Sequence, residues 1–321
     1  MDVHSKNYTL CAMEPIIGEE DRIFATTEVT ADYKNILLFI ANLELTLGLE
    51  HEYDIQCGYE AGCLGYSLYN QLTAAGVKCV ILAPATMLTP QGKRIKTDAR
   101  DARLIAKCLS YGGYHAVYVP TEEDDSVKEY LRMRDDHKIA LKKIKQQINA
   151  FCLRHGYGYG ETKWTGKHIS WLRKLELSPL YRETLDEYLA SYDRQMEQIE
   201  RFDQRINELA DQERYQQKVK KLSCFLGIKT HTALSLIVET GDFERFAKGN
   251  TYAAFPGLVP GEKSSAENKN RLGITKTGNK HLRVLLVEAA GGICKGKTGY
   301  KSKTLKQRQK GNSAAVTAAG S

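Results

Sequence analysis

The sequence predicts three parts: a mixed α/β domain over residues 1–118, a helical coiled-coil arm over 119–220 and a mainly α C-terminal domain over 221–321. Three observations lead to this fold class. Strand and helix periodicities alternate in the first part, long amphipathic stretches fill the second, and glycine and lysine are concentrated in the third. A chain of 321 residues is long enough for two or three domains.

In the first part, short apolar runs alternate with helical periodicity. A Pro-Ile-Ile-Gly turn separates two expected strands, which predicts a hairpin. The strand–helix alternation that follows indicates a mixed sheet with helices on its faces. The expected strands are 8–13, 22–29, 54–59 and 78–82, and the expected helices are 31–47, 64–75 and 98–109.

Two long helices are expected in the arm, over 126–154 and 180–220, on either side of a Gly/Tyr-rich break at 156–160. Apolar residues of the second helix recur at alternating steps of three and four, which predicts a coiled-coil seam. The two helices could share that seam within one chain or between chains, and a hairpin burying its own stripe fits equally well. The seam residues are Leu185, Tyr188, Tyr192, Ile199, Phe202, Ile206 and Leu209.

Positive charge is concentrated near the C-terminus. Residues 261–321 contain 13 lysines and arginines against three glutamates, in a chain of net charge +7. This favours a polyanionic partner, with nucleic acid the usual one, although a basic solubilising tail has the same composition. A glycine turn at 226–233 resembles a helix–hairpin–helix element, residues 255–279 are expected to form an extended functional loop, and helix returns at 280–290.

Several function classes are disfavoured. No apolar run is long enough to span a membrane, and the N-terminus lacks the pattern of a signal peptide. The eight cysteines include no Cys-x-x-Cys pair, which argues against a zinc site and favours a reducing cytoplasm.

Four carboxylates stand out as candidate metal ligands. Glu60 ends an expected strand, while Asp98 and Asp101 open a helix and share one face because they are three residues apart. Asp2 precedes the first readable strand. Carboxylate oxygens suit Mg²⁺, although each residue taken singly is more often a helix-terminal or surface acid.

Residues 2–6 (DVHSK), 59–62 (YEAG) and 96–102 (KTDARDA) resemble the three acidic motifs of the DEDD transposases, a family that includes the Piv-type DNA invertases. Residues 255–260 (FPGLVP), 264–265 (SS) and 273–283 (GITKTGNKHLR) resemble its second conserved domain. The resemblance implies a RuvC-like RNase H fold, Mg²⁺ held by Asp2, Glu60, Asp98 and Asp101, and a serine that forms a phosphoserine link with DNA. It also implies a structured guide RNA (bridge or seeker RNA) and homodimers that assemble into tetramers. A bacterial cytoplasmic protein associated with the nucleoid is expected.

Ser265 is the first candidate nucleophile and Ser264 the second, because the family pattern is Ser-Gly and this chain has Ala266 in place of the glycine. A serine attacker conserves bond energy for rejoining, whereas water would only cut. Lysines and arginines are the candidate phosphate contacts, although the arm lysines fit a solvated helix face equally well. They are Lys276, Lys280 and Arg283 for DNA, and Lys138, Lys142, Lys143 and Lys145 for the RNA backbone.

The chain departs from the family pattern at both ends. Only Met1 precedes Asp2, so the first strand is expected to be nearly absent and Asp2 loosely held. The C-terminal sequence stops early, and together these features predict a shortened or misannotated reading frame, with an active and an inactive product both left open. Two alternatives stay open: a RuvC-like nuclease that hydrolyses branched or nicked DNA, and a non-enzymatic regulator that binds nucleic acid.

Overall fold

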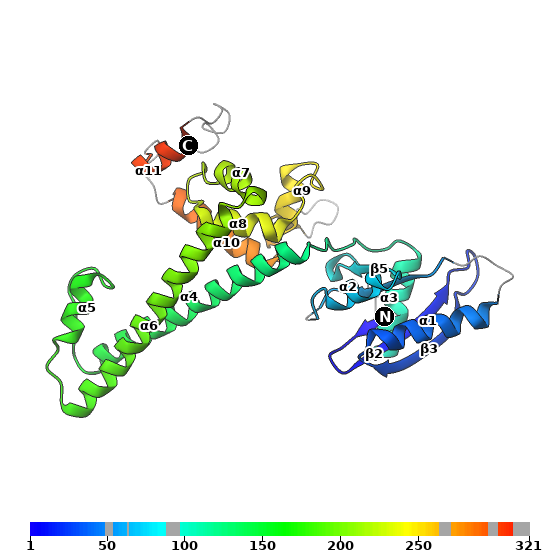
Figure 1. Cartoon of the computed structure of the whole chain (residues 1–321), viewed down its shortest axis with the longest axis horizontal. Helices are drawn as coiled ribbons and strands as arrows, with labels where there is room; N and C mark the ends of the chain where they lie inside the picture. The colour runs from blue at the N-terminus through cyan, green and yellow to red at the C-terminus, as the bar shows by residue number, and fades with distance from the viewer. Residues whose placement is uncertain (49–53, 63, 88–96, 263–270, 295–300, 311–321) are drawn as a thin grey trace. The chain divides into compact units, whose positions relative to one another are not determined.

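The computed structural model describes residues 1–48, 54–62, 64–87, 97–262, 271–294 and 301–310 (Figure 1). The chain folds into two compact units, Met1–Val119 and Pro120–Ser321. Each unit has its own buried apolar clusters.

The first unit is built on two sets of strands. β1 (Asp2–Val3), β2 (Asn7–Glu14) and β3 (Arg22–Thr30) pair antiparallel, whereas β4 (Gln56–Glu60) and β5 (Lys78–Leu82) pair parallel. The two sets meet where β1 lies beside β4 and the Met1 ammonium donates a hydrogen bond of 2.8 Å to the Gly58 carbonyl. The strands therefore follow one another in the order β3, β2, β1, β4, β5.

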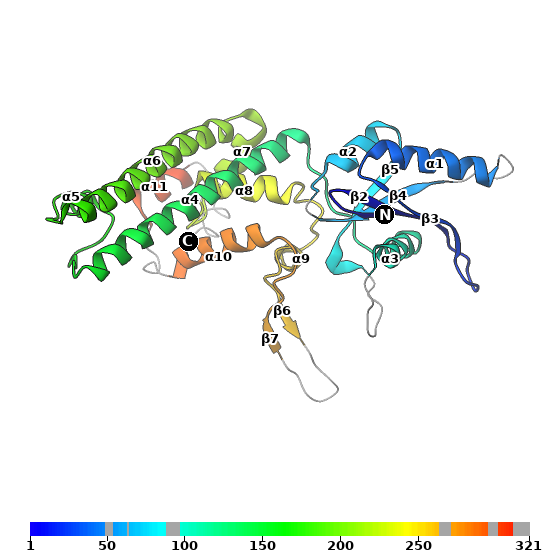
Figure 2. The same ribbon diagram turned by 90° about the horizontal axis from the view of Figure 1, so that it is seen from below.

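Helices cover both faces of these strands. α1 (Tyr33–Leu47) and α2 (Ser67–Ala74) lie on one face, and α3 (Asp98–Ser110) packs on the other against β1, β2 and β4 (Figure 2). A short 3₁₀ helix, Pro84–Thr86, follows β5. The Thr97 hydroxyl starts α3 by accepting a hydrogen bond from the Arg100 amide. The predicted alternation of strands and helices is thus observed, and α3 is held against the sheet with its first turn exposed.

Two long helices dominate the second unit. α4 (Glu122–Arg154) and α6 (Pro179–Ala210) pack against each other within the chain. The apolar stripe of α6, including Leu185 and Tyr192, is buried against α4 residues such as Ile148. The stripe is therefore covered inside the chain, as the hairpin alternative expected.

The single helix predicted over 180–220 is wrong. The helix is interrupted at Asp211 and Gln212, and α7 (Glu213–Leu222) follows as a separate helix. The break lets Tyr215 and Val219 pack into the cluster around α8. A short helix, α5 (Gly166–Arg173), also lies where none was predicted.

α8 (Thr230–Thr240) is almost wholly buried, and α4, α6 and α7 pack against it. α9 (Gly249–Ala254), α10 (Lys280–Cys294) and α11 (Lys303–Gln309) complete the unit. The segment expected to be an extended loop contains an antiparallel pair, β6 (Pro260–Glu262) and β7 (Arg271–Ile274), that projects from these helices (Figure 2).

Two further expectations from the sequence concern membrane-spanning helices and the state of the cysteines. Within the part that the structure describes, no helix is both long and apolar enough to cross a membrane. The cysteines whose side chains the structure describes are free thiols, and all of them except Cys11 are buried. Burial raises the pKa of the Cys79 thiol to about 12, so this thiol is unreactive at neutral pH.

Candidate active site

Two of the four candidate carboxylates come together at the N-terminal end of α3. Asp2 lies in β1 and Asp98 is the first residue of α3. One oxygen of each carboxylate and one ring nitrogen of His4 all lie within 4.8 Å of one another. Two carboxylates and an imidazole form a donor set suited to a divalent cation. We call Asp2, His4 and Asp98 the acidic cluster.

The other two candidate carboxylates belong to elements that border this cluster. Glu60 is the exposed last residue of β4, the strand beside β1. Asp101 lies one turn after Asp98 on α3. Among the described residues, neither of them joins the set within 4.8 Å. The structure therefore brings Asp2 and Asp98 together, whereas Glu60 and Asp101 lie outside the acidic cluster.

The expectation that Asp2 is loosely held is wrong for this structure. Asp2 pairs with Thr9 of β2, and its side chain is only 17 % exposed. Met1 is itself buried, its ammonium is bonded to Gly58, and burial lowers the pKa of that ammonium. A two-residue strand is enough here because it is held by β2 on one side and contacts β4 on the other.

His4 was missed by the sequence analysis. Its Nε2 lies 3.3 Å from Asp2 Oδ2, so the imidazole faces the carboxylate directly. The signal was available, because residues two apart in an extended strand share a face. A histidine two residues after a candidate metal ligand was therefore a candidate itself.

Ser264 and Ser265 lie outside the described residues, but the strands on either side of them in sequence are well defined. Three backbone hydrogen bonds close the base of the β6–β7 hairpin: Thr275 N to Val259 O, 2.9 Å; Lys276 N to Gly257 O, 3.1 Å; and Asn279 N to Phe255 O, 3.2 Å. We call residues 255–259 and 275–279 the hairpin base.

Two glycines allow the segments of the hairpin base to cross closely. Gly257 and Gly278 have φ angles of +69° and +71°, which L-residues with a side chain rarely adopt. A Cβ atom would lie 2.2 Å from the Thr277 carbonyl oxygen at Gly257 and 2.0 Å from the Phe255 carbonyl oxygen at Gly278. The fit leaves no room for a side chain at either position.

The three cations predicted to follow the serine differ in their surroundings. Lys276 and Lys280 are exposed. Lys276 adopts a left-handed backbone, with φ of +56°, at the point where the hairpin base turns. Arg283 instead donates hydrogen bonds from Nη1 to the carbonyls of Pro256, at 2.6 Å, and Thr277, at 3.1 Å. Arg283 therefore braces the hairpin base from α10.

The four arm lysines also divide into two kinds. Lys138, Lys142 and Lys143 are exposed on α4. Lys145 is half-buried, with its ammonium 5.3 Å from the ring centroid of Trp164 and 5.6 Å from that of Tyr192. Burial, followed by the nearby Lys138 charge, lowers the pKa of Lys145. Lys145 therefore contributes a cation–π contact to the packing of the arm.

The glycine turn predicted to resemble a phosphate-binding element is used for packing. Gly227 has φ of +83°, and a Cβ there would lie 2.3 Å from the Ala289 carbonyl oxygen. The absence of a side chain at Gly227 thus lets α10 pack closely against this turn.

Comparison with known proteins gives two family matches. The DEDD-type transposase model of the IS110 group matches residues 1–155, and the model described as transposase IS116/IS110/IS902 family matches residues 219–307. The first match implies a RuvC-like RNase H fold, which agrees with the strand order of the first unit.

Several curated relatives are similar to this chain. The transposase for insertion sequence element IS1533 of Leptospira borgpetersenii is 31 % identical over 99 % of this chain and 90 % of the relative. The putative transposase y4qE of Sinorhizobium fredii is 33 % identical over 77 % of this chain, a match that spans 60 % of that relative's length. The transposase for insertion sequence element IS1328 of Yersinia enterocolitica is 29 % identical over 71 % of this chain and 68 % of the relative.

Proposed function

Because the chain belongs to the IS110 family of DEDD-type insertion-sequence transposases, we propose that it cleaves and rejoins DNA strands through a covalent serine–DNA link, with Mg²⁺ as cofactor. DNA is the partner that follows from membership of this family. The observation that carries the proposal is the acidic cluster, in which Asp2, His4 and Asp98 place donor atoms within 4.8 Å of one another.

The acidic cluster fits the needs of a hard cation. Asp2 comes from a paired strand and Asp98 from the start of a helix, so both backbones are fixed. In the proposed site, Glu60 and Asp101 add oxygens from β4 and from the next turn of α3. When bound, Mg²⁺ neutralises phosphate oxygens and lowers the barrier to attack at phosphorus.

The proposed nucleophile is Ser265, with Ser264 as the second choice. Its Oγ forms a bond to phosphorus while the bond from phosphorus to one deoxyribose oxygen breaks. The serine hydroxyl releases its proton to solvent and the departing oxygen takes one up from solvent, so atoms and charge balance. The closely crossed hairpin base supports this role, because a nucleophile must be held within a fraction of an ångström.

A guide RNA and self-association complete the proposal. The exposed Lys138, Lys142 and Lys143 offer phosphate contacts along α4, and Lys276 and Lys280 offer them beside the hairpin base. We also propose homodimers that assemble into tetramers. The buried stripe of α6 is not free for a coiled coil between chains, whereas Ile139 and Met196 of the arm are exposed.

The direct test is DNA cleavage by purified protein with cognate RNA and DNA. Asp98→Ala should abolish Mg²⁺-dependent cleavage, lowering the rate by about a thousandfold or more. Asp54→Asn is the control, because Asp54 is an exposed acid of the same unit that pairs with Lys78 in a surface contact. It should leave the rate unchanged, and equal loss in both variants would contradict the assignment.

Two further variants separate the alternatives. If Ser265→Ala and Ser264→Ala both cut as fast as the wild type, the protein is a nuclease that uses water. If Asp98→Ala combined with Asp101→Ala leaves the biological effect intact, the protein acts as a nucleic-acid-binding regulator.

A further inference from the structure

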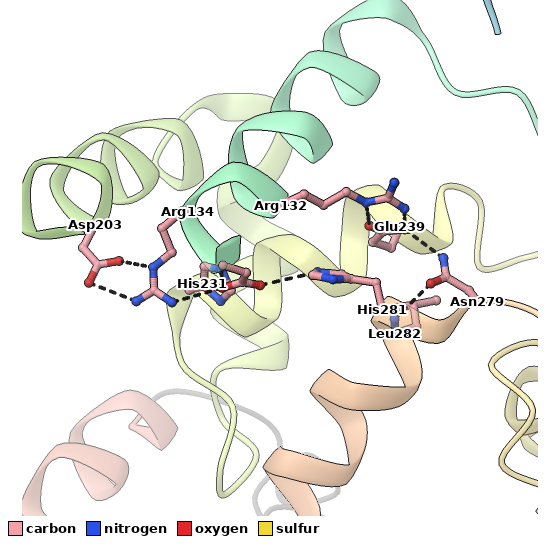
Figure 3. Close-up of polar contacts among 9 residues, drawn as sticks. Arg132, Arg134, Asp203, His231, Glu239, Asn279, His281 and Leu282 are labelled. Atoms are coloured by element: carbon pink, nitrogen blue, oxygen red, sulfur yellow. Dashed lines mark hydrogen bonds and ion pairs between the residues drawn. The ribbon is translucent and has the colours of Figure 1, made fainter. Parts of the chain in front are cut away.

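The first turn of α10 is tied to a buried carboxylate of α8. Glu239 has a side chain that is only 3 % exposed. Arg132 of α4 donates to both of its oxygens, from Nε to Oε1 at 2.7 Å and from Nη2 to Oε2 at 2.9 Å. Asn279 donates from Nδ2 to Oε2 at 2.8 Å. Figure 3 shows these side chains converging from α4, α8 and the start of α10.

Asn279 connects this carboxylate to the hairpin base. Its Oδ1 accepts a hydrogen bond of 3.0 Å from the Leu282 amide, which is the capping bond of α10. Its backbone amide donates to the Phe255 carbonyl at 3.2 Å, on the opposite segment of the hairpin base. One residue therefore ends the hairpin, begins the helix and contacts Glu239.

A second carboxylate, that of the partly buried Asp135, faces the same turn of α10. His281 Nε2 lies 3.5 Å from Asp135 Oδ2, and His231 Nε2 of α8 lies 3.1 Å from Asp135 Oδ1. Arg134 also contacts Asp135, at 3.1 Å. Burial alone would raise the pKa of Asp135, but His231 and Arg134 together hold it below the ordinary value. This second contact supports the same turn from α4.

Directional bonds matter at α10 because its apolar packing is limited. Leu282 and Leu285 are buried, whereas Val284 and Val287 are half exposed. Apolar contacts tolerate sliding and rotation, but a carboxylate with fixed donors does not. A buried carboxylate is costly unless every partner is present, so Glu239 favours the one orientation of α10 in which Asn279 reaches it.

We propose that Glu239 and Asn279 are positioning residues: together they fix the direction in which the β6–β7 hairpin leaves the helical unit. The inference rests on the proposed function only in that the hairpin strands flank Ser264 and Ser265 in sequence. Neither residue takes part in bond making. Their role is to hold the hairpin base in one register against α4 and α8.

A reciprocal swap tests this pairing. Asn279→Asp keeps a capping oxygen for the Leu282 amide but places a second carboxylate against Glu239. Adding Glu239→Gln restores an amide–carboxylate pair, now with the amide at position 239 and the carboxylate at position 279. Asn279→Asp should slow formation of the covalent protein–DNA adduct by about tenfold or more at unchanged DNA affinity, because positioning affects the chemical step. The double variant should recover to within about threefold of the wild type.

Hydrogen exchange in the free protein provides a readout that does not depend on catalysis. The amides of Thr275 and Lys276 should exchange faster in Asn279→Asp and return toward the wild-type rate in the double variant. Asn250→Asp, an exposed change in α9, is the control and should alter neither readout.

These two readouts separate the possible failures. If the wild type forms no adduct, the proposed function is wrong, and exchange alone decides the positioning role. If the double variant exchanges no more slowly than Asn279→Asp, the positioning role is overturned. If Asn279→Asp does not fold, Asn279→Ser carries the same comparison, because serine keeps a capping oxygen but lacks the amide. Wild-type exchange in Asn279→Ser would also overturn the proposal.

Discussion

Gly278→Ala should loosen the hairpin base without disturbing the rest of the helical unit. The new Cβ would lie 2.0 Å from the Phe255 carbonyl oxygen, so the two segments must separate by about 1 Å to reach the closest distance that real Cβ atoms show. That movement breaks the bond of 3.2 Å from the Asn279 amide to Phe255.

The size of the expected destabilisation follows from two energetic costs. An alanine held at φ of +71° costs about 1–2 kcal/mol, and the lost backbone hydrogen bond costs about 1 kcal/mol. We therefore expect a local destabilisation of about 2–3 kcal/mol, which corresponds to roughly 30- to 150-fold faster exchange of the Lys276 amide.

Gly273→Ala is the matched control for this prediction. Gly273 lies in β7 of the same hairpin, and an added Cβ there would meet no described residue within 4 Å. Its exchange rates should stay close to those of the wild type. Equal exchange at Lys276 in Gly278→Ala and Gly273→Ala would refute the argument that close backbone crossing requires glycine at position 278.

Three other predictions follow from side-chain contacts. Asp124→Asn should destabilise the protein by about 1–3 kcal/mol at neutral pH, because Asp124 is bound by the partly exposed Arg214. Burial raises the pKa of the Asp124 carboxyl, but its hydrogen-bond partners lower that pKa by more. The carboxylate therefore stabilises the fold fully above its ordinary pKa of 3.8, and this stabilisation is lost as the pH falls through the lower pKa of the folded state. The unfolding temperature measured from pH 7 to 2 should accordingly vary less with pH in the variant than in the wild type. Lys145→Ala should lower thermal stability by about 1 kcal/mol through loss of the contact with Trp164, and an unchanged unfolding midpoint would contradict this. Lys142→Gln should weaken RNA binding at all sequences and reduce the slope of log affinity against log salt by about 1, as measured by filter binding, whereas an unchanged slope would place Lys142 away from the RNA.

Local periodicity predicted most of the first unit. The strand Lys78–Leu82 was predicted with its observed bounds, because a glycine turn precedes it and a proline follows it. The break between α6 and α7 was not predicted, because residues 211–220 contain no proline or glycine that would mark the end of a helix. What ends α6 at Ala210 is the packing of α7 beside α8, which is a tertiary effect.

The candidate site was predictable to the extent that motifs mark it. Asp2 and Asp98 were identified from their motifs, and the structure brings them together with His4. The contact between Arg132 and Glu239 joins residues 107 positions apart, and no local pattern in the sequence indicates it. Asn279 could be recognised from sequence as part of a motif, but its two simultaneous contacts depend on where α8 lies.

The most direct test of the central claim is to map the covalent protein–DNA adduct by mass spectrometry after reaction with cognate DNA, RNA and Mg²⁺. The account predicts a phosphoserine link at Ser265, or at Ser264 as the second choice, that is absent without Mg²⁺ and absent in Asp98→Ala. Strand exchange by the wild type with no adduct at either serine, or an adduct that forms equally well in Asp98→Ala, would contradict it.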